Sequence, residues 1–359
     1  YNCILTTWDS GRQVVSHKMD RHDYAFKPLF AEMVACVPEG GLEWAIDNVL
    51  KAYEKLCQLP RAPRVPQVQI TQGDAAHLYT LDDGSLTAIV VDPPYLDNVI
   101  FSEMADFFYV WLKRTVGRYY PEWFTSLLCE HTEEAIANPG RLPHLSGKFA
   151  KQQSHQHYQR KMREAFAEWR RVLRDDGVLT VMFMHKTQEA WESLFETLIE
   201  AGFQITATWP VKTESEYSLH IAGKNAAQST VLLTARKRVQ GAGVGFWNWA
   251  LQDEIRQRVR ETAERLEREG LNKVDQLVGT FGAAMAVFSR YDAVRTDTGE
   301  TVSVRDALEL ASDAVMQWQI EQIAARGLER VDAESQFILL CWDVLSAAEF
   351  RFNEAKLIG

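Results

Sequence analysis

The sequence predicts an α/β protein with a largely parallel sheet, followed by a part that is almost entirely helical. Up to residue 240, short runs rich in β-branched and aromatic residues alternate with helical stretches, and beyond it nearly every stretch has helical periodicity. Strands separated by helices favour parallel pairing, with helices on the faces of the sheet. The chain has 359 residues, 46% of them hydrophobic, so it exceeds one typical domain and can bury a substantial core.

Five runs have the length and composition of β-strands. They are residues 67–71, 88–91, 178–184, 203–209 and 229–235. A long helical stretch separates the second run from the third, and residues 188–201 have helical periodicity that ends before Gly202, a natural C-cap. Because ligands of such sheets bind beyond the carboxyl ends of the strands, the residues that follow these runs are the first candidates for a site.

The remainder of the chain predicts helices. Residues 247–269 interleave arginine with glutamate, which is typical of an exposed helix with ion pairs between successive turns. Further helices with apolar faces are expected at residues 274–288, 304–325 and 335–348. Their function cannot be read from their composition.

Three parts are therefore expected along the chain. They are a helical or irregular N-terminal segment at residues 1–62, a central domain at residues 63–240 and a helical accessory domain at residues 241–359. The glycine-rich run at residues 241–245 is interpreted as a flexible linker between the last two.

Composition limits the partners and the compartment. The formal net charge of -10 and the pI near 5.5 argue against a protein that coats polyanions generally, but they leave room for a local basic groove. No apolar stretch approaches the ~20 residues of a membrane span, and no secretory signal pattern opens the chain. Since the chain begins at Tyr1 without a methionine, we expect further sequence upstream.

Cysteine usage fits a reducing cytoplasm. The cysteines lie far apart and form no Cys-x-x-Cys pair, so neither a zinc site nor a disulfide framework is indicated. The five residues are Cys3, Cys36, Cys57, Cys129 and Cys341.

The tetrapeptide Asp92-Pro93-Pro94-Tyr95, directly after the apolar run at residues 88–91, is the most specific motif. The exocyclic amino nitrogen of adenine or cytosine is a poor nucleophile until acceptors hold its hydrogens. Asp92 can supply one acceptor and the Pro93 carbonyl another, because each proline fixes its own φ and biases the preceding residue to extended geometry. Tyr95 offers a ring face on which a base turned out of its duplex can stack. The alternative is a plain turn that ends a strand.

These residues resemble the amino-group DNA methyltransferases. The closest resemblance is to the large adenine-specific DNA methylases of archaea and bacterial defence islands, which carry an N-terminal domain of unknown function. It rests on Gly11-Arg12-Gln13, Asp23-Tyr24, Ala31-Glu32-Met33, the Asp92 motif, residues 106–114, Val172-Leu173, residues 183–186, Thr208-Trp209-Pro210, and residues 213–216 and 288–291. The resemblance implies the class I methyltransferase (Rossmann-like) fold, S-adenosylmethionine as methyl donor and adenine in DNA as acceptor.

One departure from the family pattern concerns the donor. Such enzymes hold S-adenosylmethionine on an Asp/Asn-Pro-Phe-x-Gly-x-Gly loop after the first strand, and the sequence upstream of Asp92 contains no such loop. The predicted strands would then be the later ones of a seven-stranded sheet, without the first two. Three explanations stay open: upstream sequence supplies the donor half, a second chain supplies it, or the chain is a catalytically silent binding subunit. Methylation of cytosine or of RNA is a further alternative.

Weaker candidates surround the motif. Gly73-Asp74-Ala75 follows a predicted strand, where this fold commonly places a residue near the adenine of the donor, so Asp74 could hydrogen-bond it. The alternative is that Asp74 caps the next helix. Asn98 and Ser102 lie close to the motif in sequence. His185 and Lys186 end a strand on the same rim as Asp92, where they could touch the target base or a phosphate.

Residues 114–163 are the candidate target-recognition region, because they mix aromatic with basic side chains in a long loop or small insertion. Arg141, Lys148 and Lys151 are its principal phosphate candidates, while a solvated helix of mixed charge would have the same composition. The histidines of this region lack acidic or cysteine partners at ligand spacing, so no metal site is expected. The stripe Phe107, Phe108, Val110, Trp111 and Leu112 is expected in the core.

Overall fold

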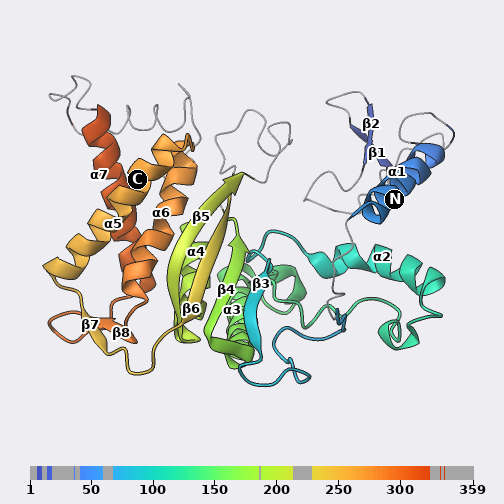
Figure 1. Cartoon of the computed structure of the whole chain (residues 1–359), viewed down its shortest axis with the longest axis horizontal. Helices are drawn as coiled ribbons and strands as arrows, with labels where there is room; N and C mark the ends of the chain where they lie inside the picture. The colour runs from blue at the N-terminus through green and yellow to red at the C-terminus, as the bar shows by residue number, and fades with distance from the viewer. Residues whose placement is uncertain are drawn as a thin grey trace. The chain divides into compact units, whose positions relative to one another are not determined.

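The computed structural model of the chain describes residues 6–9, 14–17, 36, 41–59, 68–185, 187–212, 229–323, 332 and 335. The chain divides into two compact units, one of residues 1–72 and 101–131 and one of residues 73–100 and 132–359. The larger unit contains a sheet with its helices, so the protein is a mixed α/β protein, as predicted (Figure 1).

A four-stranded sheet lies at the centre of the larger unit. Its strands are β3 (Leu86–Val91), β4 (Leu173–Phe183), β5 (Phe203–Lys212) and β6 (Ser229–Lys237). The strand order is β3-β4-β6-β5. β3 pairs with β4 in parallel, whereas β6 is antiparallel to both of its neighbours. Within the described part of the chain, β3 and β5 are therefore the two edges of this sheet.

Two strand predictions were wrong. The sheet is not largely parallel, because β6 inserts between β4 and β5 and is antiparallel to both. Parallel pairing was expected only where a helix separates two strands, and no helix was predicted between β5 and β6. The predicted first strand does not form either. Of its residues, Gln67 lies outside the described ones, and residues 68–71 have no strand partner, with Val68 and Ile70 more than three-quarters exposed.

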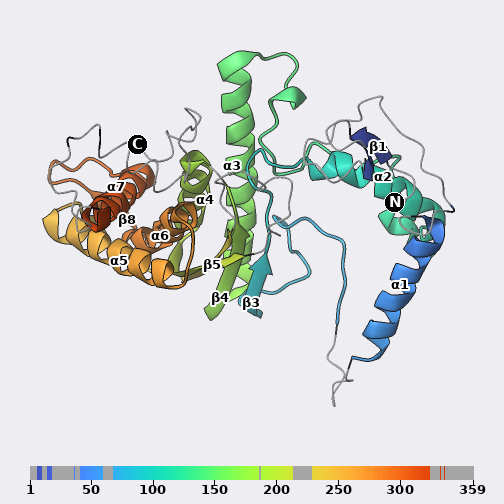
Figure 2. The same cartoon turned by 90° about the horizontal axis from the view of Figure 1, so that it is seen from above.

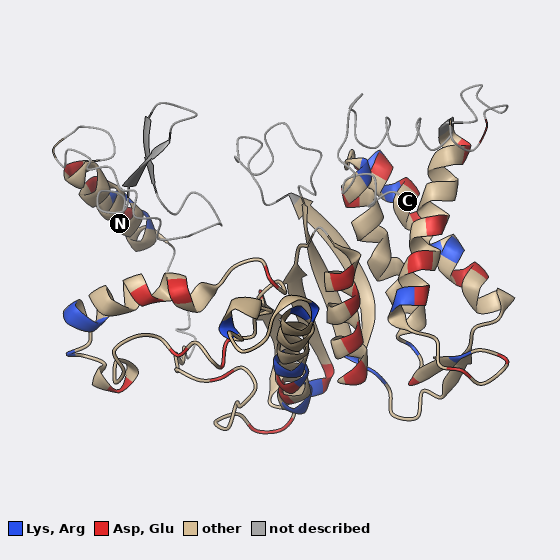
Figure 3. Ribbon diagram, turned by 180° about the vertical axis from the view of Figure 1, so that it is seen from behind, with Lys and Arg blue, Asp and Glu red and all other residues tan. Residues whose placement is uncertain are grey.

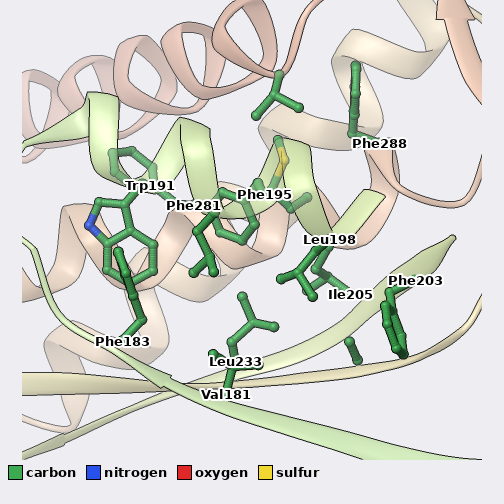
Figure 4. Close-up of a cluster of buried hydrophobic side chains, with 14 of the residues drawn as sticks. Val181, Phe183, Trp191, Phe195, Leu198, Phe203, Ile205, Leu233, Phe281 and Phe288 are labelled. Atoms are coloured by element: carbon green, nitrogen blue, oxygen red, sulfur yellow. The ribbon is translucent and has the colours of Figure 1, made fainter. Parts of the chain in front are cut away.

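The core lies between one face of the sheet and the helices α3 (Gly147–Val172) and α4 (Gln188–Glu200), which pack against each other (Figures 1 and 2). Figure 4 shows Trp191 of α4 among aromatic side chains: its ring contacts Phe183 of β4, Phe281 of α6 and Phe195 one turn along α4. Side chains on the buried face of β4 alternate with partly exposed ones, as a half-covered sheet requires. The prediction of a helix at residues 188–201 is confirmed.

The helical C-terminal part is also confirmed for the residues that the structure describes. It consists of α5 (Trp249–Arg268), α6 (Lys273–Phe288) and α7 (Val304–Ile323), whereas the helix predicted at residues 335–348 falls almost wholly outside the described residues. Basic and acidic residues are interleaved along α5 (Figure 3), and Arg260 pairs with Glu264 one turn away, as predicted.

The α6 helix runs along the edge strand β5. The backbone N–H of Ile205 donates to Ser289 Oγ at 2.9 Å, and Thr208 Oγ1 donates to the Gly279 carbonyl at 3.2 Å. The glycine-rich run before α5 is not only a linker, since β7 (Val244–Phe246) pairs in parallel with β8 (Ala293–Arg295). This pairing explains Gly245, because a Cβ there would lie 2.7 Å from the ring of Tyr291.

The smaller unit contains the antiparallel strands β1 (Thr6–Asp9) and β2 (Val14–His17), together with α1 (Leu42–Cys57) and α2 (Phe101–Thr115). The prediction that the aromatic stripe of α2 is core was wrong: Phe108, Trp111 and Leu112 are each at least 40% exposed. Ser102 is the buried residue of this helix. Helical periodicity predicts an apolar face but not what covers it.

None of the described helices is long and apolar enough to cross a membrane.

Candidate acceptor site

The Asp92 motif lies at the carboxyl end of β3. Val91 pairs with Val181 of β4, and the two strands are parallel, so their carboxyl ends lie at the same edge of the sheet. The segment that follows β4 leads to His185, which lies on the same rim as the motif, as its position in the sequence predicted. Carboxyl ends of parallel strands are the usual place for a ligand in such sheets.

Asp92 and Tyr95 contact each other. The hydroxyl of Tyr95 donates to Asp92 Oδ1 at 2.5 Å, and the Tyr95 ring lies edge-on to Phe183 with centroids 5.1 Å apart. Desolvation, helped by the hydrogen bond to Asp92, raises the pKa of the Tyr95 hydroxyl well above its ordinary value, so this hydroxyl stays a donor. The Asp92 side chain is exposed, and no described residue donates to its Oδ2.

The two proline carbonyls differ. The hydroxyl of Tyr158, on α3, donates to the Pro94 carbonyl at 2.9 Å. Tyr158 is 1% exposed, and burial raises the pKa of its hydroxyl, which keeps it protonated as the donor. Among the described residues none donates to the Pro93 carbonyl. The motif therefore places an exposed carboxylate next to the buried Pro93, whose carbonyl has no donor among the described residues, while the Pro94 carbonyl is engaged.

A tight turn holds the residues after the motif. Leu96 has a φ of 50°, the left-handed region that costs a non-glycine residue energy, and its side chain is 2% exposed. Its carbonyl accepts from Ala137 N at 2.8 Å, and Asn98 N donates to the Tyr95 carbonyl at 3.0 Å. Burial of Leu96 and these two bonds maintain the conformation, and they leave Asn98 exposed beside the motif.

His185 is tied to the turn by its ring. Its Nδ1 accepts from the backbone N–H of Thr187 at 3.1 Å, so the proton of the neutral ring resides on Nε2, which lies 3.2 Å from Asp97 Oδ1. The hydrogen bond from His185 is the main cause that lowers the pKa of Asp97. The His185 side chain is 7% exposed, so its geometry suits a residue that fixes the rim rather than one that reaches a ligand.

The candidate donor residues Gly73, Asp74 and Ala75 are attached to α3. The Ala75 carbonyl accepts from Trp169 Nε1 at 3.0 Å, while Asp74 Oδ1 accepts from Ala76 N at 2.9 Å and its Oδ2 lies 3.2 Å from His77 Nδ1. The hydrogen bond from the Ala76 backbone is the main cause that lowers the pKa of Asp74. Both carboxylate oxygens of Asp74 therefore serve a local turn, and no helix follows for it to cap.

The other predicted site residues are dispersed. Ser102 belongs to the smaller unit, and Lys186 lies outside the described residues. Arg141 pairs with Glu134 at 2.7 Å and Lys151 with Glu189 at 3.6 Å, whereas Lys148 is exposed at the start of α3. The predicted recognition region is not one insertion, because its last seventeen residues are the first part of α3, from Gly147.

The described residues do not form a complete site for S-adenosylmethionine. Two acidic side chains, Asp74 and Asp92, were expected near it: Asp74 is engaged locally, and Asp92 holds the Tyr95 hydroxyl with Oδ1. No glycine-rich loop precedes Asp92 in the sequence. In the described part of the chain there is also no group of three or more His, Cys, Asp or Glu placed to hold a metal ion.

Sequence reasoning missed three residues that shape the site. Tyr158 and Phe183 position the motif, and Asp97 links it to His185. Tyr158 lies 64 residues from Pro94, and no local pattern distinguishes it from other aromatic side chains of a helix. The one clue to Phe183 was its place at the end of the strand next to β3.

Comparison with known proteins gives one match. A family model described as DNA methylase matches residues 86–281, which span the sheet, the Asp92 motif and the first part of the C-terminal helices. No curated protein and no solved structure matches the chain.

Proposed function

Because this chain belongs to the DNA methylase family, we propose that it methylates the exocyclic amino group of adenine in DNA, with the Asp92 motif as the site that holds the amine. The observation that carries the proposal is a pair of acceptors at the end of β3, Asp92 Oδ2 and the Pro93 carbonyl, to which no described residue donates. The Asp92 carboxylate is exposed. Two acceptors match the two hydrogens of an amino group.

The acceptors act by orienting the nitrogen. Hydrogen bonds from the amine to Asp92 and to the Pro93 carbonyl draw electron density onto the nitrogen and fix the direction of its lone pair. Much of the rate then comes from proximity and orientation. The proton that leaves the methylated nitrogen passes to bulk water, since Asp92 is exposed, and no general base is required.

Tyr95 is proposed to stack on a base that is turned out of the duplex. Its ring is held from one side by Phe183, and its hydroxyl is held by Asp92, so the ring cannot turn freely. A base between stacking and hydrogen-bonding groups is what enzymes acting on flipped bases require. Asn98, exposed next to the motif, is the further proposed contact to the base or its sugar.

We propose that the donor-binding half, with the S-adenosylmethionine site, is supplied by sequence or by a chain outside these residues and docks beside β3. Two observations support this. β3 pairs with no second strand in the described part of the chain, and Val90 on it is 72% exposed. The same face continues over Thr180 and Met182 of β4, which are only partly covered, whereas the opposite face is buried. Parallel strands are normally covered on both faces.

The strand order also supports the later half of a class I methyltransferase sheet. β3 and β4 form a parallel pair joined through α3, and the last strand, β6, inserts between β4 and β5. The first strands of a seven-stranded sheet would then extend it from β3, next to Asp92. Target recognition is proposed for the segment before and at the start of α3, where Lys148 and Lys151 are exposed and Arg141 is paired with Glu134.

The test is transfer of a labelled methyl group from S-adenosylmethionine to DNA by the protein as its native gene and any partner encode it. Asp92→Ala is expected to abolish transfer without unfolding the chain, because the side chain is exposed. Asp175→Ala, in which the side chain is fully exposed on β4, is the control and is expected to keep activity. Equal transfer by wild type and Asp92→Ala would remove the motif from the mechanism.

Different substrates distinguish methylation of adenine from that of cytosine, and of DNA from that of RNA. Oligonucleotides that contain only adenine or only cytosine as an amino-bearing base, and matching RNA, show which base and which nucleic acid is modified. We expect product from the adenine DNA alone. A silent binding subunit is tested by calorimetry: no S-adenosylmethionine binding, with or without a partner, would favour it over the enzyme.

A further inference from the structure

A second candidate site lies at the other edge of the sheet. A cavity of about 310 Å³ is bounded by β5 on one side and by α5 and α6 on the other. β5 and β3 are opposite edges of the sheet, so the cavity is separate from the Asp92 motif. Its volume is at the lower end of the range for small-molecule pockets, roughly 300–1,000 Å³.

The cavity concentrates positive charge in an acidic chain. Three arginines line it: Arg258, Arg265 and Arg290. Arg290 is neutralised by Glu254, with Nη1 2.7 Å from Oε1. Arg258 and Arg265 have no carboxylate within ion-pair distance among the described residues, although the neighbouring Arg260 pairs with both Glu264 and Glu321. Two guanidinium groups therefore face the cavity without a counter-charge.

One donor in the cavity wall lacks an acceptor. The Nε–H of Arg265 is buried and has no hydrogen-bond partner. A buried donor without a partner costs stability, and native proteins rarely retain one unless a ligand or water completes it. Because this nitrogen is itself buried, an anion in the cavity would accept instead from the terminal guanidinium nitrogens of Arg265 and Arg258, in charge-assisted hydrogen bonds, which are the strong ones.

An aromatic surface lies beside the charges. Trp209 lines the cavity and is 51% exposed, and the guanidinium of Arg265 lies 5.0 Å from its ring centroid. The arginine therefore covers part of the indole and leaves the rest open to a planar group. Thr262, on α5, lies between Arg258 and Arg265 in the wall and adds a hydroxyl.

We propose that this cavity binds a nucleotide through its phosphate. The terminal guanidinium nitrogens of Arg258 and Arg265 hold the phosphate oxygens, and the open part of Trp209 stacks on the base. The ligand is either a free mononucleotide or one nucleotide of a single strand, which have this chemistry in common. The inference does not depend on methyl transfer, because it concerns other residues and is tested by binding alone.

The test is calorimetry of the complete chain with adenosine monophosphate, inorganic phosphate and adenosine. We expect adenosine monophosphate to bind, inorganic phosphate to bind more weakly and to compete, and adenosine not to bind measurably. The double variant Arg258→Gln/Arg265→Gln is expected to lose about tenfold or more in affinity, since hydrogen bonds to charged groups are the strong ones. Trp209→Ala is expected to lose about fivefold or more through the missing stack.

Controls keep the result specific. Arg256→Gln removes the same charge from the same helix outside the cavity, where Arg256 bonds only to Gln252 among the described residues, and is expected to bind as wild type does. Arg258→Gln alone, at an exposed position, guards against misfolding of the double variant. Binding of a short single strand that Arg258→Gln weakens, without binding of the mononucleotide, assigns the site to a strand. No binding of either ligand, or equal losses in Arg256→Gln and Arg258→Gln, would overturn the proposal.

Discussion

Asp92 and Tyr95 share a hydrogen bond, so the tyrosine has two separable properties, its hydroxyl and its ring. Tyr95→Phe removes the bond to the carboxylate and keeps the ring, and we expect methylation to fall by less than tenfold. Tyr95→Ala removes the stack, which is worth about 1–3 kcal/mol per base, so the rate should fall roughly 5- to 150-fold. Steady-state rates of both variants check this. A Tyr95→Phe variant as impaired as Tyr95→Ala would show that the hydroxyl, not the ring, is required.

Tyr158 stabilises the Asp92 motif through the hydrogen bond from its hydroxyl to the Pro94 carbonyl. Tyr158→Phe leaves the Pro94 carbonyl without its donor in a buried setting, so we expect the free energy of unfolding to fall by about 1–3 kcal/mol and methylation to fall with it. Urea unfolding measures the first effect. Tyr79→Phe, at a side chain that is 84% exposed, is the control and should change neither. Unchanged stability in Tyr158→Phe would contradict the assigned hydrogen bond.

Asp97 gives the rim a dependence on pH. The hydrogen bond from His185 lowers the pKa of the Asp97 carboxyl in the folded state. The interaction therefore stabilises the fold fully above the ordinary Asp pKa of about 3.9, and this stabilisation is lost as the pH falls through the lowered pKa of the folded state. Because the side chain is 55% exposed, the effect is below about 1 kcal/mol. Asp97→Ala should lower stability at pH 7 and converge with wild type in acid. Unfolding curves from pH 7 to pH 2 test this, with exposed Asp297→Ala as control.

At the residue scale, the sequence predicted where the Asp92 motif lies but not which residues hydrogen-bond to it and to the turn that follows it. The Asp92 motif and His185 each follow a run whose strand composition is local information, and the rule that strands joined through a helix pair in parallel then puts both on one edge of the sheet. Tyr158 and Asp97 depend on contacts across 64 and 88 residues, which no pattern in one sequence encodes. The role expected for Arg141 and Lys151 as phosphate contacts stays a prediction, and their ion pairs within the protein would have to open for it.

At the scale of elements, α6 and β5 approach each other closely through a glycine. A Cβ on Gly282 would lie 1.9 Å from Thr208 Cγ2, so Gly282→Ala must push the helix away from the strand. We expect a loss of about 1–3 kcal/mol in unfolding free energy. The double variant Gly282→Ala/Thr208→Ala should lose less than the sum of the single variants, because the two closest atoms, Thr208 Cγ2 and Oγ1, are gone and only Cβ, at 2.6 Å, remains too close. Additive losses in thermal or urea unfolding would contradict this contact.

The helices were predictable and the strand directions were not. Residues 188–201, 247–269 and 274–288 repeat apolar side chains at helical spacing, and α4, α5 and α6 match these ranges closely. Nothing local sets whether a strand runs parallel or antiparallel to its neighbours, so the insertion of β6 could not be foreseen. The run at residues 67–71 has strand composition but no partner, and composition alone does not make a strand.

At the scale of the whole molecule, methyl transfer at Asp92 requires a donor-binding half, which we propose lies beside β3. The 359-residue chain alone is expected to bind S-adenosylmethionine weakly or not at all, and the protein in its native complement to bind it well. Val90→Lys should impair donor binding by the complete assembly while leaving the stability of the isolated chain unchanged, since Val90 is 72% exposed on the open edge. Thr206→Lys, exposed on the opposite edge strand, is the control. Equal donor affinity of Val90→Lys and wild type would place the donor half elsewhere.

The carboxylate of Asp92 is proposed to direct methyl transfer to the amino group of adenine in DNA. The decisive experiment is nucleoside mass analysis of DNA from cells that express the protein from its native gene, with any partner encoded beside it. We expect N6-methyladenine with the wild type and none above background with Asp92→Ala. Methyladenine that persists in the Asp92→Ala cells at the wild-type level would contradict it.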